Sequence, residues 1–467
     1  MTPRIAILGA GPVGLGAAYR LVELGHRDFT VYERTRSLGG LAASETDGAG
    51  FTYDVGGHVM FSHYEYFDRL VDRMLGEDYT ELMRESWIRM QGRWIPYPLQ
   101  NNVRHLPADV LLECLHGLVD AQGADPAGAE SFAEWIERQF GAGITRHFMR
   151  PYNLKVWAHP LEMMSKDWIA ERVSVVDLKR VLANVVHQQD DVGWGPNNTF
   201  KYPLYGGTGG LYSRFEPHLR GHLQLGREVV EIDATARSLR FADGGEAAYD
   251  VLISAVPIPD LLRMLREVPE SLLRACSDLH HSHGVVVGVG VARPCTTSKC
   301  WTYFPERDCP FYRVTFLSNY SPNMAPPGHT LLLTETSWSP HREIDRVGIV
   351  ERVVDGLVAT RLLRAEDRAR IVATHTTEVE YFYPVPTRGR DRALARIQPW
   401  LMARDIYSRG RFGAWKYEIS NMDHCVMQGV EVVDSLLLGR PETTWRPEPP
   451  SLSGIRLELG GDAAVVR

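Results

Sequence analysis

The chain has 467 residues, of which 44% are apolar and 23% are charged, and it carries a formal net charge of -7 at pH 7. These values are typical of a globular protein with an ample core, and the length is sufficient for two or three domains. Lysine and arginine are scattered along the chain, so the sequence offers no basic stripe for nucleic acid or an anionic membrane. No apolar run approaches the roughly 20 residues of a membrane-spanning helix.

Cysteine usage and the start of the chain predict a cytoplasmic protein. The six cysteines include no C-x-x-C pair, which favours free thiols over a disulfide framework or a zinc site. The first predicted strand begins close to Met1, which leaves no room for a signal peptide. His280, His281 and His283 are neighbours in sequence, but no further ligand has suitable spacing. The sequence therefore predicts no metal site.

The clearest local motif lies near the N-terminus. An apolar strand at 5–8 leads into a G-x-G-x-x-G loop formed by Gly9, Gly11 and Gly14, and a helix and a second strand ending at Glu33 follow. Glycines in such a loop let the backbone approach a pyrophosphate at a helix N-terminus, and the acid accepts hydrogen bonds from a ribose. This order of elements predicts that the chain binds a dinucleotide.

The residues that follow favour FAD over a nicotinamide cofactor. Arg34, Gly39 and Gly40 resemble the R-x-x-G-G extension of FAD-dependent amine oxidase-type flavoproteins. Segment 227–257 supports this interpretation, because its alternating pattern, Gly-Gly turn and final apolar strand predict a hairpin followed by a buried strand. In such flavoproteins the first of these strands returns to the adenine, which implies that Val229 lies there.

The rest of the chain predicts a helical region and a second set of strands. Apolar residues at helical spacing between 111 and 119 are expected to face the core, and strand patterning covers 283–335 and 376–383. The predicted fold class is α/β, with a Rossmann-like FAD-binding domain, an inserted helical bundle domain and an antiparallel β-sheet domain. The expected boundaries are 1–80, 191–290 and 405–467 for the FAD-binding domain, 103–190 for the helical substrate-binding domain, and 81–102 with 291–404 for the sheet domain.

Seven segments mix arginine, aromatic residues and asparagine at positions that prolines and glycines mark as loops. They are 83–102, 148–160, 171–173, 193–200, 300–322, 381–387 and 408–431. A core does not accept so many donors unless they are satisfied, and loops on a rigid scaffold are where binding residues concentrate. Arginines suit phosphate, aromatic rings suit a base or sugar, and tyrosine and asparagine suit hydroxyl groups. Together the segments predict a site for an anionic, hydroxyl-rich and partly flat ligand.

Long strings within these segments carry a more specific signal. The strings span nearly the whole chain, and in their order they resemble the UDP-galactopyranose mutase family. The resemblance is greater to the eukaryotic-type branch than to the short bacterial one. The strings are GGHVMFSHYEYFD, WIPYPLQNN, FMRPYNLKVWA, GGTGGLY, CPFYR, SNYSP and SRGRFGAWKYE. The resemblance implies an FAD-dependent isomerase, formally an intramolecular transferase, within the amine oxidase-like flavoproteins.

The resemblance also implies a set of flavin neighbours. In the family the G-G-H stretch lies against the isoalloxazine ring, which places Gly56, Gly57 and His58 beside the flavin and Phe61 on the substrate side. Positions that meet FAD and the sugar side in the family fall on Arg411 and Asn421.

The substrate residues implied by the family are spread over the whole chain. Its two diphosphate-binding arginines fall on Arg172 and Arg313. The residues that hold the diphosphate and sugar fall on Tyr303, Tyr383, Tyr417 and Asn197, the uridine contacts fall on Tyr97, Gln100, Phe148, Asn153 and Trp157, and Arg84 and Trp301 border the same site.

The implied reaction interconverts UDP-galactopyranose and UDP-galactofuranose. In the family, N5 of reduced FAD is the nucleophile that attacks the anomeric carbon, and no net redox change occurs. The expected partners are a nucleotide-sugar substrate and a reductant for the flavin, either external or NAD(P)H. A homo-oligomer is compatible with the sequence, whereas nucleic acid and membrane partners are not expected.

Departures from the family leave alternatives open. Leu99 stands where eukaryotic-type members tend to have a ring beside the uracil, which leaves open the same chemistry on a different nucleotide sugar. Met422, Val426 and Gln428 also differ from the usual residues near the flavin. A flavin oxidase or desaturase is a further alternative, and it would need an apolar substrate tunnel in place of paired arginines. An inert sugar-nucleotide binding protein is the last, and a turnover test separates it from the others.

Overall fold

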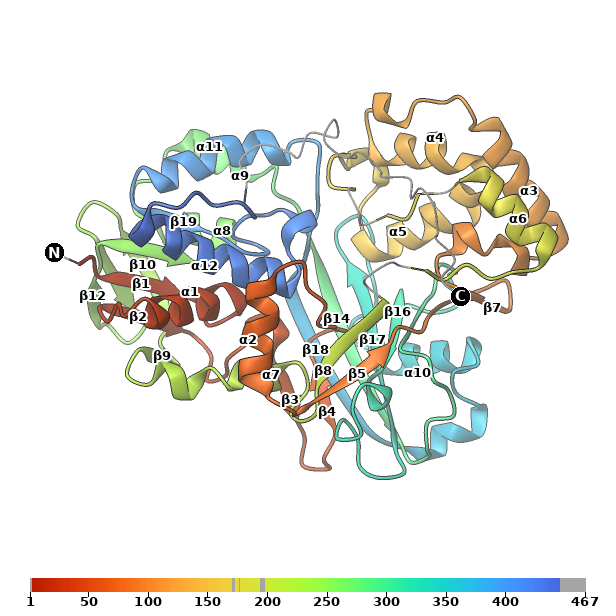
Figure 1. The fold of residues 1–467 in the computed structure, drawn as a ribbon, viewed down its shortest axis with the longest axis horizontal. Helices are drawn as coiled ribbons and strands as arrows, with labels where there is room; N and C mark the ends of the chain where they lie inside the picture. The colour runs from red at the N-terminus through yellow and green to blue at the C-terminus, as the bar shows by residue number, and fades with distance from the viewer. Residues whose placement is uncertain (1, 170–172, 176, 194–197, 446–467) are drawn as a thin grey trace, which may run out of the picture.

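A five-stranded parallel sheet forms one side of the molecule (Figure 1). The structure is a computed structural model, and it describes residues 2–169, 173–175, 177–193 and 198–445. The sheet order is β19 (Ile406–Ser408), β13 (Val251–Ser254), β1 (Ile5–Leu8), β2 (Phe29–Glu33) and β9 (Leu223–Leu225). The central strand β1 is entirely buried, as expected for a parallel strand that is covered on both faces.

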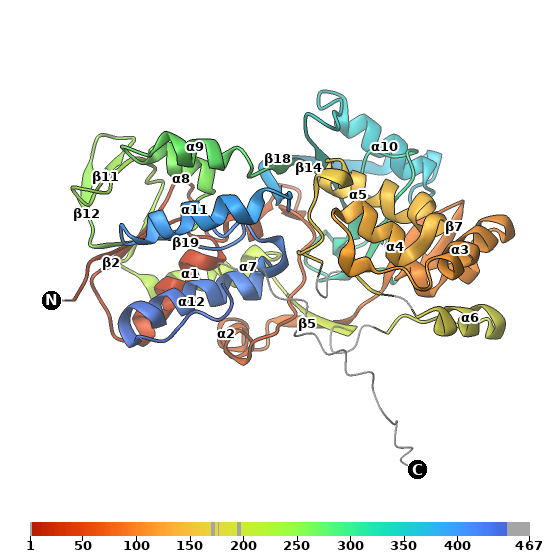
Figure 2. The same ribbon diagram turned by 90° about the horizontal axis from the view of Figure 1, so that it is seen from above.

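Helices cover both faces of this sheet, as the view from above shows (Figure 2). Ile5 and Ile7 face α1 (Pro12–Glu23) and α12 (Met422–Leu438). Ala6 and Leu8 face the opposite layer because successive strand side chains alternate. That layer consists of α8 (Ile258–Met264), α9 (Glu270–Cys276), α11 (Arg390–Met402) and a small sheet of β10 (Val229–Asp233), β11 (Ser238–Phe241) and β12 (Glu246–Ala248).

A seven-stranded, mostly antiparallel sheet forms the middle of the molecule. Its order is β18 (Ile371–Pro384), β14 (His281–Val291), β17 (Thr330–Trp338), β16 (Arg313–Phe316), β15 (Trp301–Tyr303), β6 (Ser86–Met90) and β7 (Arg93–Pro96). Only the β15–β6 pair is parallel among the described strands of this sheet. Val285, Val287 and Val289 pack on one face with α10 (Ile349–Ala359).

The helical region covers the other face of this sheet. It contains α3 (Ala108–Asp120), α4 (Phe132–Ile144), the π-helical turn η5 (Thr145–Met149), α5 (Arg150–Trp157) and α6 (Leu178–His187). Residues of α3 to α5 share one core cluster with Val286, Leu331 and Leu333 of the sheet. Smaller elements lie between the two halves: α2 (Glu65–Leu75), α7 (Gly209–Ser213), the β3 (Ser44–Thr46) and β4 (Thr52–Asp54) pair, and the β5 (Tyr79–Met83) and β8 (Thr199–Pro203) pair.

The predicted fold class is confirmed, but two local expectations differ from the structure. Residues 281–290, assigned from the sequence to the FAD-binding domain, belong to β14 and pair only with β17 and β18 among the described strands. A buried strand of alternating valines fits either sheet, so its pattern did not identify its partners. In α3, Leu112 and Val119 are exposed rather than buried, because α3 covers the core with only part of its apolar surface.

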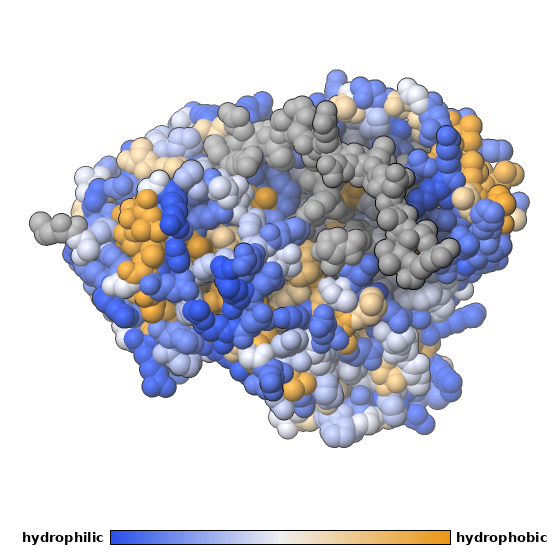
Figure 3. Space-filling view, viewed as in Figure 1, coloured by the Kyte–Doolittle hydropathy of each residue, from blue (hydrophilic) through white to orange (hydrophobic). Residues whose placement is uncertain are grey.

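Hydrophobic side chains gather at the right edge of the face that Figure 3 shows. Leu112 and Val119 of α3 and Leu182 and Val186 of α6 are exposed apolar side chains. Among the described residues, no helix has the length and apolar character needed to cross a membrane.

Candidate functional site

The loop between β1 and α1 has the geometry of a dinucleotide-binding turn. Gly9 has a φ of +97°, a conformation that favours glycine. A Cβ on Gly14 would lie 1.9 Å from the carbonyl oxygen of Gly9, so only glycine lets the helix approach the loop this closely. A Cβ on Gly11 would meet nothing closer than 3.8 Å, and Gly11 is the N-cap of α1 with no side-chain cap. The first turn of α1 is therefore open to an anion.

Glu33 ends β2 with its carboxylate fixed beside this loop. Its Oε2 atom accepts a hydrogen bond from the N–H of Ala10 at 2.8 Å, and Oε1 accepts from the N–H and hydroxyl of Thr35 at 2.8 and 2.9 Å. Gly39 and Gly40 both have positive φ, and the N–H of Gly39 donates to the carbonyl of Ala10. The structure thus brings the predicted acid and glycine pair against the same loop.

Four more residues predicted to contact the cofactor lie at the ends of elements. Arg34 is exposed directly after β2, and Val229 begins β10 at the edge of a core cluster. Asn421 is the N-cap of α12. Arg411 lies in the loop after β19, and its guanidinium carbon is 4.9 Å from the ring centroid of Tyr383. Their contacts with a cofactor stay predictions.

The G-G-H segment is tied to the seven-stranded sheet through its backbone. The N–H of Gly57 donates to Oε1 of Glu335 at 2.8 Å, and Nη2 of Arg313 donates to the carbonyl of Gly57 at 3.1 Å. A Cβ on Gly57 would lie 2.4 Å from Oγ1 of Thr315, so this position has no room for a side chain. Both peptide groups of Gly57 are therefore held by side chains of β16 and β17.

His58 is held as the neutral imidazole. Its Nδ1 atom lies 2.9 Å from the carbonyl oxygen of Gly56, and because a carbonyl only accepts, Nδ1 is the protonated nitrogen. Desolvation lowers the pKa of His58, and the nearby guanidinium groups of Arg411 and Arg313 lower it further against the opposing charge of Asp54. Nε2 therefore carries the lone pair.

Arg313, which is partly buried, and Glu335, which is fully buried, form an ion pair at the centre of the site. They lie directly opposite each other on β16 and β17, and Nε and Nη2 of Arg313 donate to the two carboxylate oxygens, each at 2.8 Å. Glu335 is 1% exposed. Burial alone would lower the pKa of Arg313, but the carboxylate of Glu335 and neighbouring tyrosines raise it well above its usual range. The guanidinium is therefore a fixed cation whose orientation Glu335 sets.

Two tyrosines extend this network. The hydroxyl of Tyr312 donates to Oε2 of Glu335 and lies 3.1 Å from the hydroxyl of Tyr383. Since the Tyr312 proton is used by the carboxylate, the hydroxyl of Tyr383 donates to Tyr312 and keeps its own lone pairs free. Burial raises the pKa of Tyr383 to about 12, and Arg313 opposes that rise. Tyr383 is therefore neutral at physiological pH.

Aromatic rings surround this network from two directions. The ring centroid of Trp157 lies 5.7 Å from that of Tyr383 and 4.8 Å from that of Tyr417. On the other side, Tyr303 lies 5.0 Å from Tyr97 and 5.3 Å from Tyr152. The edge-on geometry of most of these pairs is the arrangement that aromatic rings favour.

The remaining predicted substrate residues lie around these rings. Phe148 lies in the π-helical turn η5 and stacks on Tyr152 of α5, with the ring centroids 5.2 Å apart. π-Helical turns are frequent at functional sites. Arg84 lies 5.7 Å from the ring of Tyr97 and 5.0 Å from that of Trp301. Phe61 packs edge-on against His63.

Amide side chains complete the described site. Asn153 donates from Nδ2 to the carbonyl of Met149 and accepts from Nε1 of Trp157. Gln100 donates to the carbonyl of Ser174, but within the described ranges its buried Oε1 has no hydrogen-bond partner. Nε1 of Trp301 likewise has none there. Arg172 and Asn197 lie outside the described residues.

The sequence interpretation missed three residues of this network: Glu335, Tyr312 and Tyr152. For Glu335 a signal existed, because it is a carboxylate inside the apolar strand Thr330–Trp338. A charge at such a position needs a partner, since an unpaired buried charge is costly.

Comparison with known proteins identifies the relatives of this chain. The family model for flavin containing amine oxidoreductases matches residues 14–437. A crystal structure of reduced UDP-galactopyranose mutase is 44% identical to this chain and superposes with a TM-score of 0.92. The match covers 95% of this chain and 96% of that one. The chain belongs to the UDP-galactopyranose mutase family, within the flavin containing amine oxidoreductases. It is accordingly a flavoenzyme of the isomerase type, as the sequence strings predicted.

More distant relatives share the fold or part of the sequence. A crystal structure of the CLA-producing fatty acid isomerase from P. acnes is 16% identical with a TM-score of 0.62, over 93% of this chain and 99% of that one, which shows the fold alone. A 4,4'-diapophytoene desaturase from Staphylococcus aureus (strain MRSA252) is 36% identical over 140 residues, or 29% of this chain. The chain spans about a quarter or less of the length of the first curated relatives it matches.

The residues present fit an FAD molecule. The family assignment implies this cofactor, and the Gly9–Gly14 loop, the open first turn of α1 and the fixed carboxylate of Glu33 form the cradle that a pyrophosphate and ribose need. The close packing of Gly14 against Gly9 excludes a side chain at position 14, as expected for a loop whose backbone approaches a pyrophosphate.

Proposed function

We propose that this protein interconverts UDP-galactopyranose and UDP-galactofuranose, with FAD active in its reduced form. The observation that supports this most strongly is the partly buried cation Arg313, anchored by Glu335 beside the G-G-H segment and surrounded by tyrosines. A fixed cation among neutral hydroxyl donors suits a sugar attached to a diphosphate. When bound, reduced FAD supplies a nucleophilic nitrogen, N5, for the anomeric carbon without net redox change.

Arg313 would hold the diphosphate. Its Nε and Nη2 atoms are used by Glu335 and Gly57, whereas Nη1 has no hydrogen-bond partner within the described ranges. Nη1 is therefore the donor available to a phosphate oxygen. Because Glu335 fixes the plane of the guanidinium before substrate binds, little reorganisation is needed as negative charge develops on the departing diphosphate.

Tyr383 and the neighbouring rings would hold the sugar and exclude water. The hydroxyl of Tyr383 donates to Tyr312, so its oxygen is free to accept a hydrogen bond from a sugar hydroxyl. Tyr417 and Trp157 pack against Tyr383 and limit its movement. His58, with a neutral imidazole and a lone pair on Nε2, offers one further acceptor on the flavin side.

The uridine would lie at the end of the site that contains Gln100, Tyr97 and Phe148. The buried Oε1 of Gln100 lacks a partner within the described ranges, and a ring N–H of uracil would satisfy it. Phe148 and Tyr97 offer aromatic surface for the base. Leu99, next to Gln100, is fully buried. It is aliphatic where eukaryotic-type members tend to have a ring beside the uracil, so another nucleotide sugar is the second candidate substrate.

A turnover assay tests this function. The flavin-loaded protein is incubated without oxygen in dithionite with UDP-galactofuranose, and the pyranose and furanose forms are separated chromatographically. We expect conversion to the pyranose, and none with protein from which the flavin has been removed. Absence of conversion from a fully reduced, flavin-loaded sample would refute the proposed substrate, and a panel of other nucleotide sugars would then identify the true one. NAD(P)H as the reductant is tested in the same assay in place of dithionite.

A further inference from the structure

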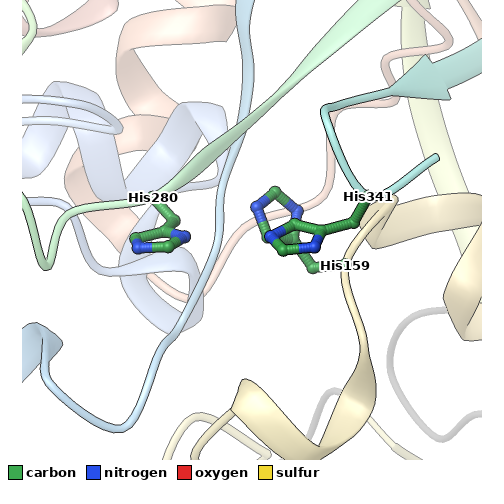
Figure 4. Close-up of side chains that lie close together, drawn as sticks. All are labelled: His159, His280 and His341. Atoms are coloured by element: carbon green, nitrogen blue, oxygen red, sulfur yellow. The ribbon is translucent and has the colours of Figure 1, made fainter. Parts of the chain in front are cut away.

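Three histidines from separate parts of the chain converge in the fold (Figure 4). His159 follows α5, His280 precedes β14, and His341 lies in the turn after β17. One ring nitrogen of each lies within 4.8 Å of those of the other two. The ring centroids of His159 and His280 are 5.6 Å apart, and those of His159 and His341 are 5.0 Å apart. The figure shows the three rings pointing toward one another.

We propose that His159, His280 and His341 bind a divalent transition metal ion of the zinc class, with water as the fourth ligand. This proposal is independent of the proposed function, because none of the three histidines belongs to the predicted cofactor or substrate site. Three imidazoles with an open fourth position form a common zinc coordination set.

The protonation state of His159 suits a metal ligand. Its Nδ1 lies 2.9 Å from the carbonyl oxygen of Trp157 and must donate to it, so the lone pair is on Nε2. A histidine ligand whose other nitrogen donates to a backbone carbonyl is the usual arrangement at metal sites. Nε2 is therefore the ring nitrogen of His159 that can bind a metal.

The three backbone positions are fixed before any metal binds. Ser339 donates its hydroxyl proton to the carbonyl of Ala158 and accepts the N–H of His341 at 3.0 Å. These two bonds connect the His341 turn to the residue next to His159. The carbonyl of His280 accepts from Nε1 of Trp415 at 3.2 Å and from the N–H of Val385 at 2.8 Å. Because the backbone at the three histidines is already held in place, metal binding costs little further conformational entropy.

The geometry needs only a small adjustment. Zinc–nitrogen bonds of about 2.0–2.1 Å in a tetrahedron place ligand nitrogens roughly 3.3 Å apart. The present spacing, within 4.8 Å, has to close to that value. His341 is exposed and His280 is half-buried, so both rings can rotate toward His159, which is buried. Imidazole nitrogens favour zinc, copper and nickel over magnesium and calcium, which prefer oxygen ligands.

A second group, His63, Asp423 and His424, is a less suitable site. Nδ1 of His63 and Nδ1 of His424 lie 2.7 and 3.0 Å from the two oxygens of Asp423. The carboxylate therefore already has partners, and a metal would have to displace both hydrogen bonds. This group serves as the internal control for the experiment.

A metal at the three-histidine site would connect three segments behind the substrate residues. His159 is two residues from Trp157, which packs against Tyr383 and Tyr417. His280 contacts Trp415 through its carbonyl, and His341 belongs to the turn that holds Ala158. The ion would therefore stabilise the junction between the helical region and the seven-stranded sheet.

The test is zinc binding by the full-length, flavin-loaded protein. Protein freed of metal by a chelator is dialysed against ZnCl₂, and bound zinc is measured per chain by mass spectrometry. We expect one zinc per chain and zinc absorption-edge spectra typical of imidazole ligands, with no competition from a hundredfold excess of MgCl₂. His341→Gln, at an exposed turn position, should weaken binding at least tenfold, and His280→Gln should do the same.

Two further variants make the outcome decisive. His341→Cys should restore binding, because a thiolate is a good zinc ligand, whereas a role of His341 in folding alone would not be rescued. His63→Gln should leave the affinity unchanged. Flavin absorbance checks that each variant is folded. Absence of bound zinc, unchanged affinity in His341→Gln, or loss of binding in His63→Gln would each overturn the proposal.

Discussion

Replacement of Arg313 by alanine should separate the two roles that this residue has in the proposed account. The variant loses the cation that would meet the diphosphate. It also leaves the carboxylate of Glu335, 1% exposed, without its counter-charge. Turnover and stability should therefore both fall, for different reasons.

The expected magnitudes follow from the contacts. Loss of one preorganised donor to developing charge costs about 2–4 kcal/mol of transition-state stabilisation, which corresponds to a roughly 30- to 1,000-fold loss in kcat/KM. Removing one partner of a buried ion pair lowers the free energy of unfolding by about 3–5 kcal/mol. The hydrogen bonds that Glu335 keeps from Gly57 and Tyr312 place the loss at the lower end of that range.

The assay measures kcat/KM for UDP-galactofuranose under dithionite, and urea unfolding of the same samples. The double variant Arg313→Gln with Glu335→Gln replaces the charged pair by a neutral amide pair. It should regain most of the stability but none of the activity. Arg20→Ala is the matched control, because Arg20 pairs with Asp434 at 2.6 Å and its side chain is 17% exposed, against 21% for Arg313. Near-normal kcat/KM in Arg313→Ala, or recovery of activity in the double variant, would contradict the proposed role of Arg313.

Three further predictions concern the cofactor side. Gly57→Ala should reduce flavin content and the unfolding midpoint, because its Cβ would lie 2.4 Å from Oγ1 of Thr315. Glu33→Gln should weaken FAD binding about tenfold, since the amide loses the charge-assisted hydrogen bond from Ala10; flavin release on dilution measures it. The pKa of His58 is lowered in the fold, so the unfolded chain binds more protons just below pH about 6.5. The free energy of unfolding should therefore fall as the pH drops through that region, and His58→Gln should make this slope shallower in urea titrations.

Matched substitutions control for these effects. Gly48→Ala tests a glycine whose added Cβ meets no atom of the described residues within 4 Å, and it should leave flavin content unchanged. Glu45→Gln removes an exposed carboxylate on β3 and should leave FAD affinity unchanged. An identical stability slope in His58→Gln and the parent protein would contradict the assignment for His58.

The cofactor end of the molecule could be predicted from sequence because its signal is local. The glycine loop, Glu33 and the Gly39–Gly40 pair follow one another within 40 residues, and each has a fixed structural role. The side chains of the apolar strand β1 alternate between the two layers that cover the sheet, which its sequence pattern also predicts. The fold class and the family could therefore be stated before any coordinates.

The contacts that complete the site could not be predicted in the same way. Arg313 and Glu335 face each other only because β16 and β17 pair in one particular register, which a single sequence does not reveal. The three-histidine cluster was missed for a related reason. His281 and His283 lie near His280 in sequence, but in the fold His281 packs at a tilt against Tyr381 and His283 stacks on Trp338. His159 and His341 come from distant segments.

Redox cycling of one sample distinguishes a flavin-dependent mutase from an oxidase. Flavin-loaded protein converts UDP-galactofuranose under dithionite, is then oxidised by air, and is finally reduced again, with the sugar forms and the flavin absorbance followed throughout. We expect conversion to stop on oxidation, to resume on reduction, and to continue for many turnovers per equivalent of reductant. Conversion at an equal rate by oxidised protein, or reductant consumed in proportion to product, would contradict it.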